Sequence, residues 1–240
     1  MIKKILNILG IDRFNNKIQT GGDESIQKAG ESSIQTGGDE SIQKAGDYSK
    51  QKAGDKSTQF AGFGSTQKAG YGSNQTAGSE STQTAGGSST QLARDNSNQT
   101  AESYSTQTAG YESTQNSGSW STQTAGHHSI QITNGGSTQT AGYNSTQKAT
   151  NESTQTAGDN SIQIAMWNST QTAGEDSTVI AYVYSNYINT ITAGKNTTIV
   201  AINIYTGKSS MLTTTEAGKT YHVSGDCIIK EVKEGENNGN

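Results

Sequence analysis

The sequence predicts an all-β solenoid, because a short polar unit recurs at a fixed spacing along most of the chain. A serine stands at every eighth position from Ser25 to Ser185, and a glutamine at every eighth position from Gln19 to Gln171. Only 28% of the 240 residues are hydrophobic, too few for the packed core of an ordinary globular domain. The net charge of −4 is small and the periodicity strict, which argues against disorder. The remaining class is a stacked-repeat protein.

The first element, residues 1–16, is expected to be an N-terminal capping segment. Apolar residues recur there at helix spacing, namely Ile2, Ile5, Leu6 and Leu9. They predict a short amphipathic helix on the first coil, and the alternative is a membrane-surface anchor helped by Lys3 and Lys4. We expect no signal peptide, because no small-residue cleavage site follows. We also expect no membrane span, because no apolar stretch approaches the ~18 residues that one needs.

The second element, residues 17–185, is the repeat array. Its unit reads Ser-x-Gln-x-Ala-Gly-x-x, in which Ser, Gln and Ala are two residues apart and therefore share one face of an extended strand. We expect these invariant positions to point inward and the residues between them to point outward. The glycine that follows, such as Gly62, suits a corner that needs positive φ or close backbone approach. The absence of proline fits strands with neighbours on both sides.

Outward residues differ between alternate octads, which predicts that two octads form one 16-residue coil. One register reads Thr-x-Thr throughout the second half of the array: Thr106/Thr108, Thr122/Thr124, Thr138/Thr140, Thr154/Thr156 and Thr170/Thr172. The other is mixed over the same stretch: Thr114/Asn116, Ile130/Ile132, Thr146/Lys148, Ile162/Ile164 and Thr178/Ile180. We therefore predict a solenoid of about ten 16-residue coils. Gln75, Gln91 and Gln107 should stack in one interior column, and Gln83, Gln99 and Gln115 in the facing one.

The third element, residues 186–233, is expected to form a small C-terminal β-cap. The octad decays after Ser185, and the composition becomes conventional. Alternating segments from Thr197 to Tyr205 and from Tyr221 to Val232 predict strands. Residues 234–240 are expected to be a disordered tail. The predicted organisation is thus a cap, an array, a second cap and a tail.

The repeats resemble those of bacterial ice nucleation proteins. The resemblance rests on Ala-Gly-Tyr-Gly-Ser-Asn-Gln-Thr (69–76), Ala-Gly-Tyr-Glu-Ser-Thr-Gln (109–115) and Ala-Gly-Glu-Asp-Ser-Thr-Val-Ile (173–180). It implies paired octads in a β-solenoid and a water-ordering role for the Thr-x-Thr rows listed above. The family's tyrosine ladder at one corner is not reproduced, because that register reads Phe63, Ser79, Asp95, Tyr111, His127, Tyr143 and Asp159. Similar short arrays occur in phage-encoded proteins.

No residue pattern predicts catalysis, a cofactor or a metal site. His127 and His128 stand at a corner, His222 lies in the cap, and no spacing brings them beside Cys227 or a particular serine. We expect no enzyme and no cofactor. Acidic pairs such as Asp23/Glu24 lack the glycine-rich nonapeptide of calcium-binding repeats and are interpreted as solvated corners. Acidic residues interleave with the lysines of the early coils, so no nucleic-acid-binding stripe is expected.

Three function classes remain open. Paired threonines on stacked strands form a regular grid of hydroxyls and methyls that can order water or bind ice, although threonine is also simply a good exposed strand former. The alternative is a structural or attachment rod, with a second copy as partner, in a phage virion or a cell-surface assembly. A binder of carbohydrate or protein is the third class. It would require corner aromatics to cluster, and we expect Tyr71, Tyr111, Trp120, Tyr143 and Trp167 to be scattered.

Overall fold

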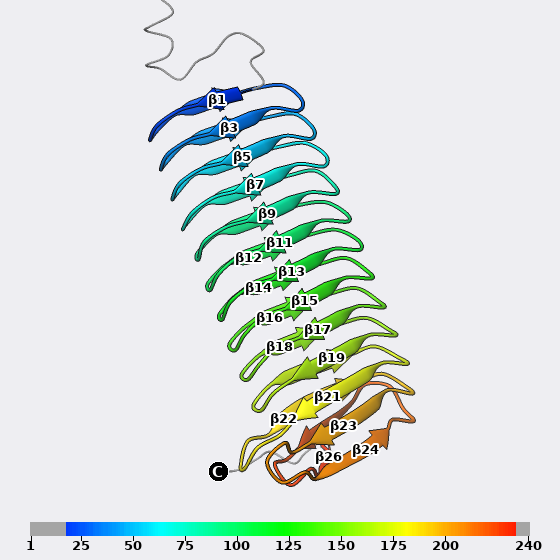
Figure 1. Cartoon of the computed structure of the whole chain (residues 1–240). Helices are drawn as coiled ribbons and strands as arrows, with labels where there is room; N and C mark the ends of the chain where they lie inside the picture. The colour runs from blue at the N-terminus through cyan, green and yellow to red at the C-terminus, as the bar shows by residue number, and fades with distance from the viewer. Residues whose placement is uncertain (1–17, 234–240) are drawn as a thin grey trace, which may run out of the picture. The chain divides into compact units, whose positions relative to one another are not determined.

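The computed structural model describes residues 18–233 and is an all-β solenoid of about twelve turns (Figure 1). These residues contain no helix, and therefore none long and apolar enough to cross a membrane. The chain divides into two compact units, Met1–Gly126 and His127–Asn240. The predicted helical cap over residues 1–16 and the tail over 234–240 lie outside the described residues.

The first unit holds two parallel sheets made from alternate strands. Odd-numbered strands follow one another in one sheet and even-numbered strands in the other. The strands are β1 (Ile18–Thr20), β2 (Ile26–Lys28), β3 (Ile34–Thr36), β4 (Ile42–Lys44), β5 (Lys50–Lys52), β6 (Thr58–Phe60), β7 (Thr66–Lys68), β8 (Asn74–Thr76), β9 (Thr82–Thr84), β10 (Thr90–Leu92), β11 (Asn98–Thr100), β12 (Thr106–Thr108), β13 (Thr114–Asn116) and β14 (Thr122–Thr124). Each strand pairs in register with the strand 16 residues away, as Gln75 pairs with Gln91.

The second unit also places alternate strands in two sheets, and its last strands pair antiparallel. Its strands are β15 (Ile130–Ile132), β16 (Thr138–Thr140), β17 (Thr146–Lys148), β18 (Thr154–Thr156), β19 (Ile162–Ala165), β20 (Thr170–Ala173), β21 (Thr178–Tyr182), β22 (Asn189–Ala193), β23 (Thr198–Ile202), β24 (Ser209–Thr213), β25 (Lys219–Val223) and β26 (Ile229–Glu231). Pairing within this unit is parallel as far as β22 and β23. Strand β24 then pairs antiparallel with β23, β25 with β22, and β26 with β25.

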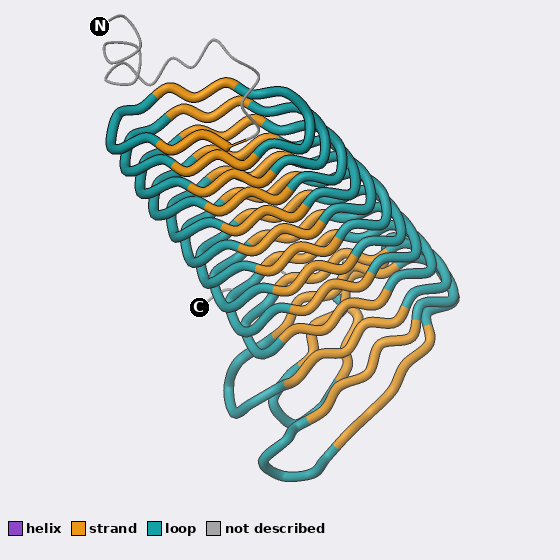
Figure 2. The backbone as a smooth tube through the Cα atoms, turned by 45° about the horizontal axis from the view of Figure 1, so that its top comes forward, coloured by secondary structure: helices purple, strands orange, loops and turns teal. Residues whose placement is uncertain are grey.

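The predicted count of about ten coils was too low. It assumed that the coils end with the octads near residue 180. Strands β22 and β23 nevertheless continue the parallel stacking, with Ala173 opposite Ala193 and Ala181 opposite Ala201. Coils stack when inward and outward residues alternate along each strand and when small inward residues lie opposite one another. Both features persist here after the last array glutamine. Figure 2 shows the short strands, in orange, separated by regular corners.

The interior of the array is polar and hydrogen-bonded, as the sequence predicts. Gln107 is fully buried, and its Nε2 donates to Gln91 Oε1 at 2.8 Å and to the backbone carbonyl of Asn116 in the opposite sheet at 3.1 Å. Gln91 in turn donates to Gln75 Oε1 at 2.9 Å. The facing column is equivalent, with Gln99 donating to Gln83 at 2.8 Å. Each amide therefore links successive coils and also ties the two sheets together.

The glycine that follows the inward alanine in the repeat is required by close approach and not by positive φ. A Cβ at Gly54 would overlap Asp39 Oδ1 and lie 2.9 Å from the Asp39 backbone nitrogen. The left-handed position is instead the residue just before each serine, such as Asn96 (φ 56°) or Gly72 (φ 64°). The acidic corner residues were interpreted as solvated, but some of them also make structural hydrogen bonds. Asp39 Oδ1 accepts a hydrogen bond from the backbone N–H of Asp55, in the next coil, at 2.8 Å.

Aliphatic packing replaces the glutamines near the end of the second unit. Val179 stands opposite Gln163, and Ile191 stands opposite Gln171. Both are fully buried in a cluster that also contains Ile199. The Oε1 atoms of Gln163 and Gln171 are consequently buried without a hydrogen-bond partner, because the next residue in each column is no longer an amide. The polar ladders therefore end where the apolar core begins.

Candidate functional site

The outward threonines of the even-numbered strands form an in-register ladder in the second unit. Strands β16, β18 and β20 pair so that Thr138, Thr154 and Thr170 stand in one column. A second column lies two residues along each strand, as the sequence predicts. Side chains in the first column are exposed, while the glutamine between each threonine pair is buried. We call this surface the threonine ladder, and its members in this unit are Thr138, Thr140, Thr154, Thr156, Thr170, Thr172, Thr190 and Thr192.

The last row, Thr190 and Thr192, was missed by the sequence analysis. Thr170 pairs with Thr190 and Thr172 with Thr192, although each pair is separated by 20 residues and not 16. The four additional residues lie at the corner before β22 and displace the row from the octad register. The Thr-Ile-Thr sequence at 190–192 was nevertheless a usable signal, because it preserves the outward Thr-x-Thr pattern around an inward apolar residue.

The first unit carries the other predicted rows at its C-terminal end. Thr106 pairs with Thr122, and Thr108 pairs with Thr124. The row before them is Thr90 and Leu92, so the pattern begins at β12 in this unit. All ten threonines predicted as a water-ordering face therefore lie on even-numbered strands, four of them in this unit and six in the second.

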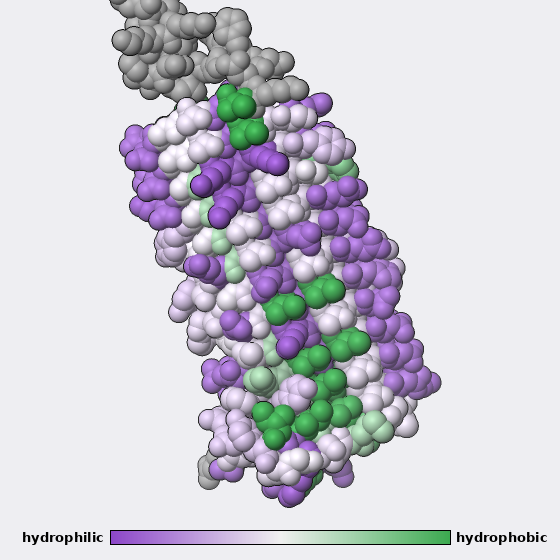
Figure 3. Space-filling model, viewed as in Figure 1, coloured by the Kyte–Doolittle hydropathy of each residue, from purple (hydrophilic) through white to green (hydrophobic). Residues whose placement is uncertain are grey.

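The odd-numbered sheet of the second unit presents a different outer surface. Its rows read Ile130/Ile132, Thr146/Lys148, Ile162/Ile164, Thr178/Ile180 and Thr198/Val200. Ile130 and Ile132 are 44% and 40% exposed, so the apolar character reaches the solvent. Figure 3 shows apolar patches interrupted by polar residues on the outside of the solenoid. This face has the same backbone spacing as the threonine ladder, but its outward side chains differ from row to row.

The buried amides hold the threonine ladder in register. Gln155 lies between Thr154 and Thr156 and donates to Gln139 Oε1 at 2.8 Å and to the Ile164 carbonyl at 3.1 Å. Its side chain is fully buried. The rows on β16, β18 and β20 each carry a buried glutamine at their centre, so sliding one of these strands past its neighbour would break interior hydrogen bonds as well as backbone ones. The last row has Ile191 at its centre and is held by apolar packing instead. The exposed grid is therefore backed by a stiff interior.

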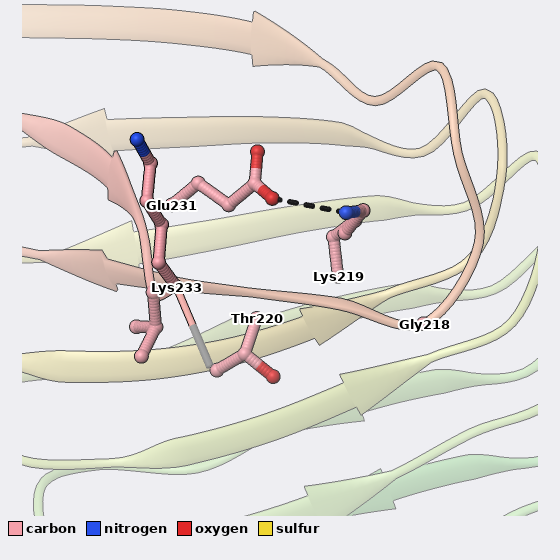
Figure 4. A pocket seen from close by; sticks show the side chains of 6 residues that line it. Gly218, Lys219, Thr220, Glu231 and Lys233 are labelled. Carbon is pink, nitrogen blue, oxygen red and sulfur yellow. Dashed lines mark ion pairs between the residues drawn. The ribbon is translucent and has the colours of Figure 1, made fainter. Parts of the chain in front are cut away.

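The cap contains a shallow hollow of about 490 Å³ with an ion-paired lysine (Figure 4). Lys219 Nζ lies 3.2 Å from Glu231 and 3.3 Å from Glu216. Hydrogen bonds to these two carboxylates, first Glu231 and then Glu216, raise the pKa of Lys219 above its usual value. A lysine held charged in this way is a poor nucleophile. We interpret the pair as a structural contact that joins β25 to β26.

The other polar candidates also have structural surroundings. His127 Nδ1 accepts a hydrogen bond from the Tyr143 backbone N–H at 3.0 Å, and the two rings stack with centroids 4.1 Å apart. Cys227 is buried. Among residues 18–233, no group of three or more His, Cys, Asp or Glu side chains is arranged to hold a metal ion.

One group of corner aromatics is not scattered. Trp167 lies next to Tyr184 and Tyr187, with ring centroids 5.9 and 6.3 Å away, and Tyr184 also contacts Tyr205. These neighbours are not among the five corner aromatics that the sequence analysis considered, so it did not predict this group. The partners of Trp167 come from segments beyond the octads, where the repeat register no longer predicts which corners coincide. We call these four residues the aromatic corner.

Comparison of the chain with family models, with curated proteins and with solved structures finds no match.

Proposed function

We propose that the threonine ladder orders water and binds ice, and that the chain acts through this surface and not by catalysis. The observation that carries the proposal is the register of the even-numbered strands in the second unit. Four successive rows present two threonines each, at equivalent positions. The resemblance of the octads to ice nucleation repeats supports the same role.

The spacing of the ladder gives the proposal its physical basis. Outward residues two apart on a strand are separated by roughly 6.8 Å, and neighbouring strands by about 4.7–4.8 Å. Each threonine places one hydroxyl and one methyl group at a point of this grid, although Thr190 and Thr192 are half-buried and the Thr192 hydroxyl is hydrogen-bonded to Thr220 Oγ1 at 3.0 Å. The hydroxyls can hydrogen-bond to a layer of water, and the methyl groups disfavour disordered water between them. A rigid grid loses little entropy when that layer forms.

The size of the surface sets the expected activity. Four rows span three strand spacings, or roughly 14 Å along the stacking direction of the second unit. Such a patch can adsorb to an ice crystal that already exists, but it organises too little water to start one efficiently. We therefore expect inhibition of ice growth, or weak nucleation at most.

The experiment compares the two faces of the second unit by thermal hysteresis. Thr154→Lys with Thr156→Lys interrupts the middle of the threonine ladder, and Ile130→Lys with Ile132→Lys makes the matched change on the odd-numbered sheet. We expect the threonine variant to lose thermal hysteresis and the isoleucine variant to retain it, with similar melting temperatures for both. Equal activity in both variants, or no activity in the parent protein, would instead favour a structural or attachment rod.

A further inference from the structure

The aromatic corner is a continuous group of rings on the second unit, in which three tyrosines are exposed and Trp167 is half-buried. Tyr184 and Tyr187 lie nearly parallel, with an interplanar angle of 24° and centroids 6.4 Å apart. Tyr184 also lies 4.7 Å from Tyr205. Tyr184, Tyr187 and Tyr205 are 41%, 45% and 65% exposed. Rings whose role was only to close the end of the solenoid would be buried like Tyr221, which is 6% exposed.

The chain departs from its repeat to form this group. In the array, the buried position of one strand follows the previous one by eight residues, but Ile191 follows Val179 by twelve. The four added residues form a longer corner that carries Tyr184 and Tyr187. The corner is closed by a hydrogen bond from the Tyr187 N–H to the Tyr184 carbonyl at 3.2 Å. The regular corners show that stacking alone does not require this insertion.

A buried asparagine fixes the neighbouring turn. Asn203 Oδ1 accepts hydrogen bonds from the backbone N–H groups of Tyr205 and Thr206, both at 3.0 Å. Its Nδ2 donates to the Gly225 carbonyl at 2.7 Å. Gly225 packs directly on the Ser185 backbone, where a Cβ would overlap the Ser185 carbonyl. The two segments that supply the tyrosines are therefore braced by backbone contacts, so the rings are held ready for a ligand.

The chemistry of the aromatic corner is neutral. The segments 166–169, 182–188 and 203–207 contain no Asp, Glu, Lys, Arg or His. Charged residues begin just beside them, with Lys208, which is ion-paired to Asp226 at 3.8 Å, and Glu152, whose backbone N–H donates to the Trp167 carbonyl. The three segments offer tyrosine hydroxyls and amides such as Asn168 and Asn186. Nucleic acids and anionic membranes are bound mainly through Lys and Arg, which are missing from these segments. Ring faces with partial negative charge, surrounded by neutral hydrogen-bonding groups, match the C–H and hydroxyl groups of an uncharged sugar.

We propose that the aromatic corner is a binding site for a neutral carbohydrate. The faces of Trp167, Tyr187 and Tyr205 contact sugar rings, and the adjacent hydroxyls and amides bind sugar hydroxyl groups. This site is separate from the threonine ladder, and the proposal does not depend on ice binding. It adds a carbohydrate-binding activity to one corner of the second unit.

The test begins with a printed glycan array that carries neutral and sialylated oligosaccharides. Affinity for the retained glycans is then measured from the fluorescence of Trp167 in a Trp120→Phe background, because the chain contains only these two tryptophans. We expect neutral glycans to be retained and to change Trp167 fluorescence. Tyr187→Ala and Tyr205→Ala should each weaken binding by about tenfold. Tyr205→Phe keeps the ring and should bind within a few-fold of the parent.

The matched control is Tyr71→Ala, which removes a ring of 56% exposure from a corner of the first unit. It should leave affinity unchanged, and melting temperatures should show that all variants fold. Retention of no neutral glycan, or of sialylated glycans only, would overturn the proposal. Equal loss in the control and the aromatic-corner variants would place binding elsewhere. Loss of self-association in Tyr205→Ala without glycan binding would assign the corner to protein contacts.

Discussion

At the scale of single residues, a glutamine inside the array makes two kinds of hydrogen bond. One joins successive coils, as from Gln107 to Gln91, and the other reaches the opposite sheet, as from Gln107 to the Asn116 carbonyl. The first follows from a periodicity of 16 and was predicted. The second could not be, because it depends on the distance between the sheets, which the pattern of residues does not encode.

Substitution of Gln107 tests this arrangement. Gln107→Leu leaves Gln91 Oε1 without its donor and removes the acceptor to which Gln123 Nε2 donates at 2.9 Å, whereas the Asn116 carbonyl keeps the hydrogen bond from the Ala101 N–H. We expect a loss of ~1–3 kcal/mol of stability for each buried group left unsatisfied. Gln107→Glu should be more destabilising, because it also buries a charge. Thermal unfolding should therefore rank the parent above Gln107→Leu and the latter above Gln107→Glu. If the glutamate variant is as stable as the leucine variant, the interior is wetter than we infer.

Substitutions at two corner glycines distinguish a requirement for close backbone approach from a requirement for positive φ. Gly54→Ala should lower the melting temperature, because the added Cβ would overlap Asp39. Gly72→Asn should be nearly neutral, because asparagine adopts the same positive φ at Asn96 and a Cβ at Gly72 would have its nearest neighbour at 3.7 Å. The opposite order of melting temperatures would show that corner φ, and not packing between coils, sets the glycine requirement.

At the scale of elements, the sequence predicts which residues of each strand point inward. It predicts the pairing register between strands only inside the octads. Each three-residue strand of the array has an inward glutamine with outward neighbours, as in Thr154–Thr156. The row Thr190/Thr192 escaped prediction because the longer corner before it changes the separation from 16 to 20 residues. The aromatic corner escaped for the same reason. Where the repeat ends, only the folded chain shows which segments become neighbours.

The cap strand β25 should loosen in alkali. The pKa of Lys219 is raised by hydrogen bonds to Glu231 and Glu216, and burial raises the pKa of Tyr221. For both groups the folded state holds its proton more tightly than the unfolded state. Their stabilising effect is thus present below the unfolded pKa values of roughly 10 and is lost as pH rises through the folded values.

The alkaline effect is tested with Lys219→Met. At pH 8 this variant should unfold at a lower temperature than the parent, by a small margin because the ion pairs are exposed. The difference should shrink as the pH is raised above 10 and the parent lysine loses its charge. A difference that stays constant between pH 8 and pH 11 would mean that the ion pairs do not contribute to cap stability.

At the scale of the whole molecule, a polar sequence forms an ordered fold because repetition replaces an apolar core. Buried amides and serines satisfy one another from coil to coil, and aliphatic packing around Val179 and Ile199 begins only where the array ends. The sequence predicted this fold class and the side on which the ten threonines lie. It underestimated the number of coils, because the parallel strands after residue 185 carry no octad signature.

The central claim is that the threonine ladder binds ice, and uptake into growing ice tests it most directly. A hemisphere of ice is grown slowly in a dilute solution of the protein, and the protein fraction in the melted ice is measured by absorbance. We predict that the parent and the Ile130→Lys/Ile132→Lys variant are enriched in the ice, whereas Thr154→Lys/Thr156→Lys is excluded into the liquid. Exclusion of the parent, or equal enrichment of both variants, would contradict the claim.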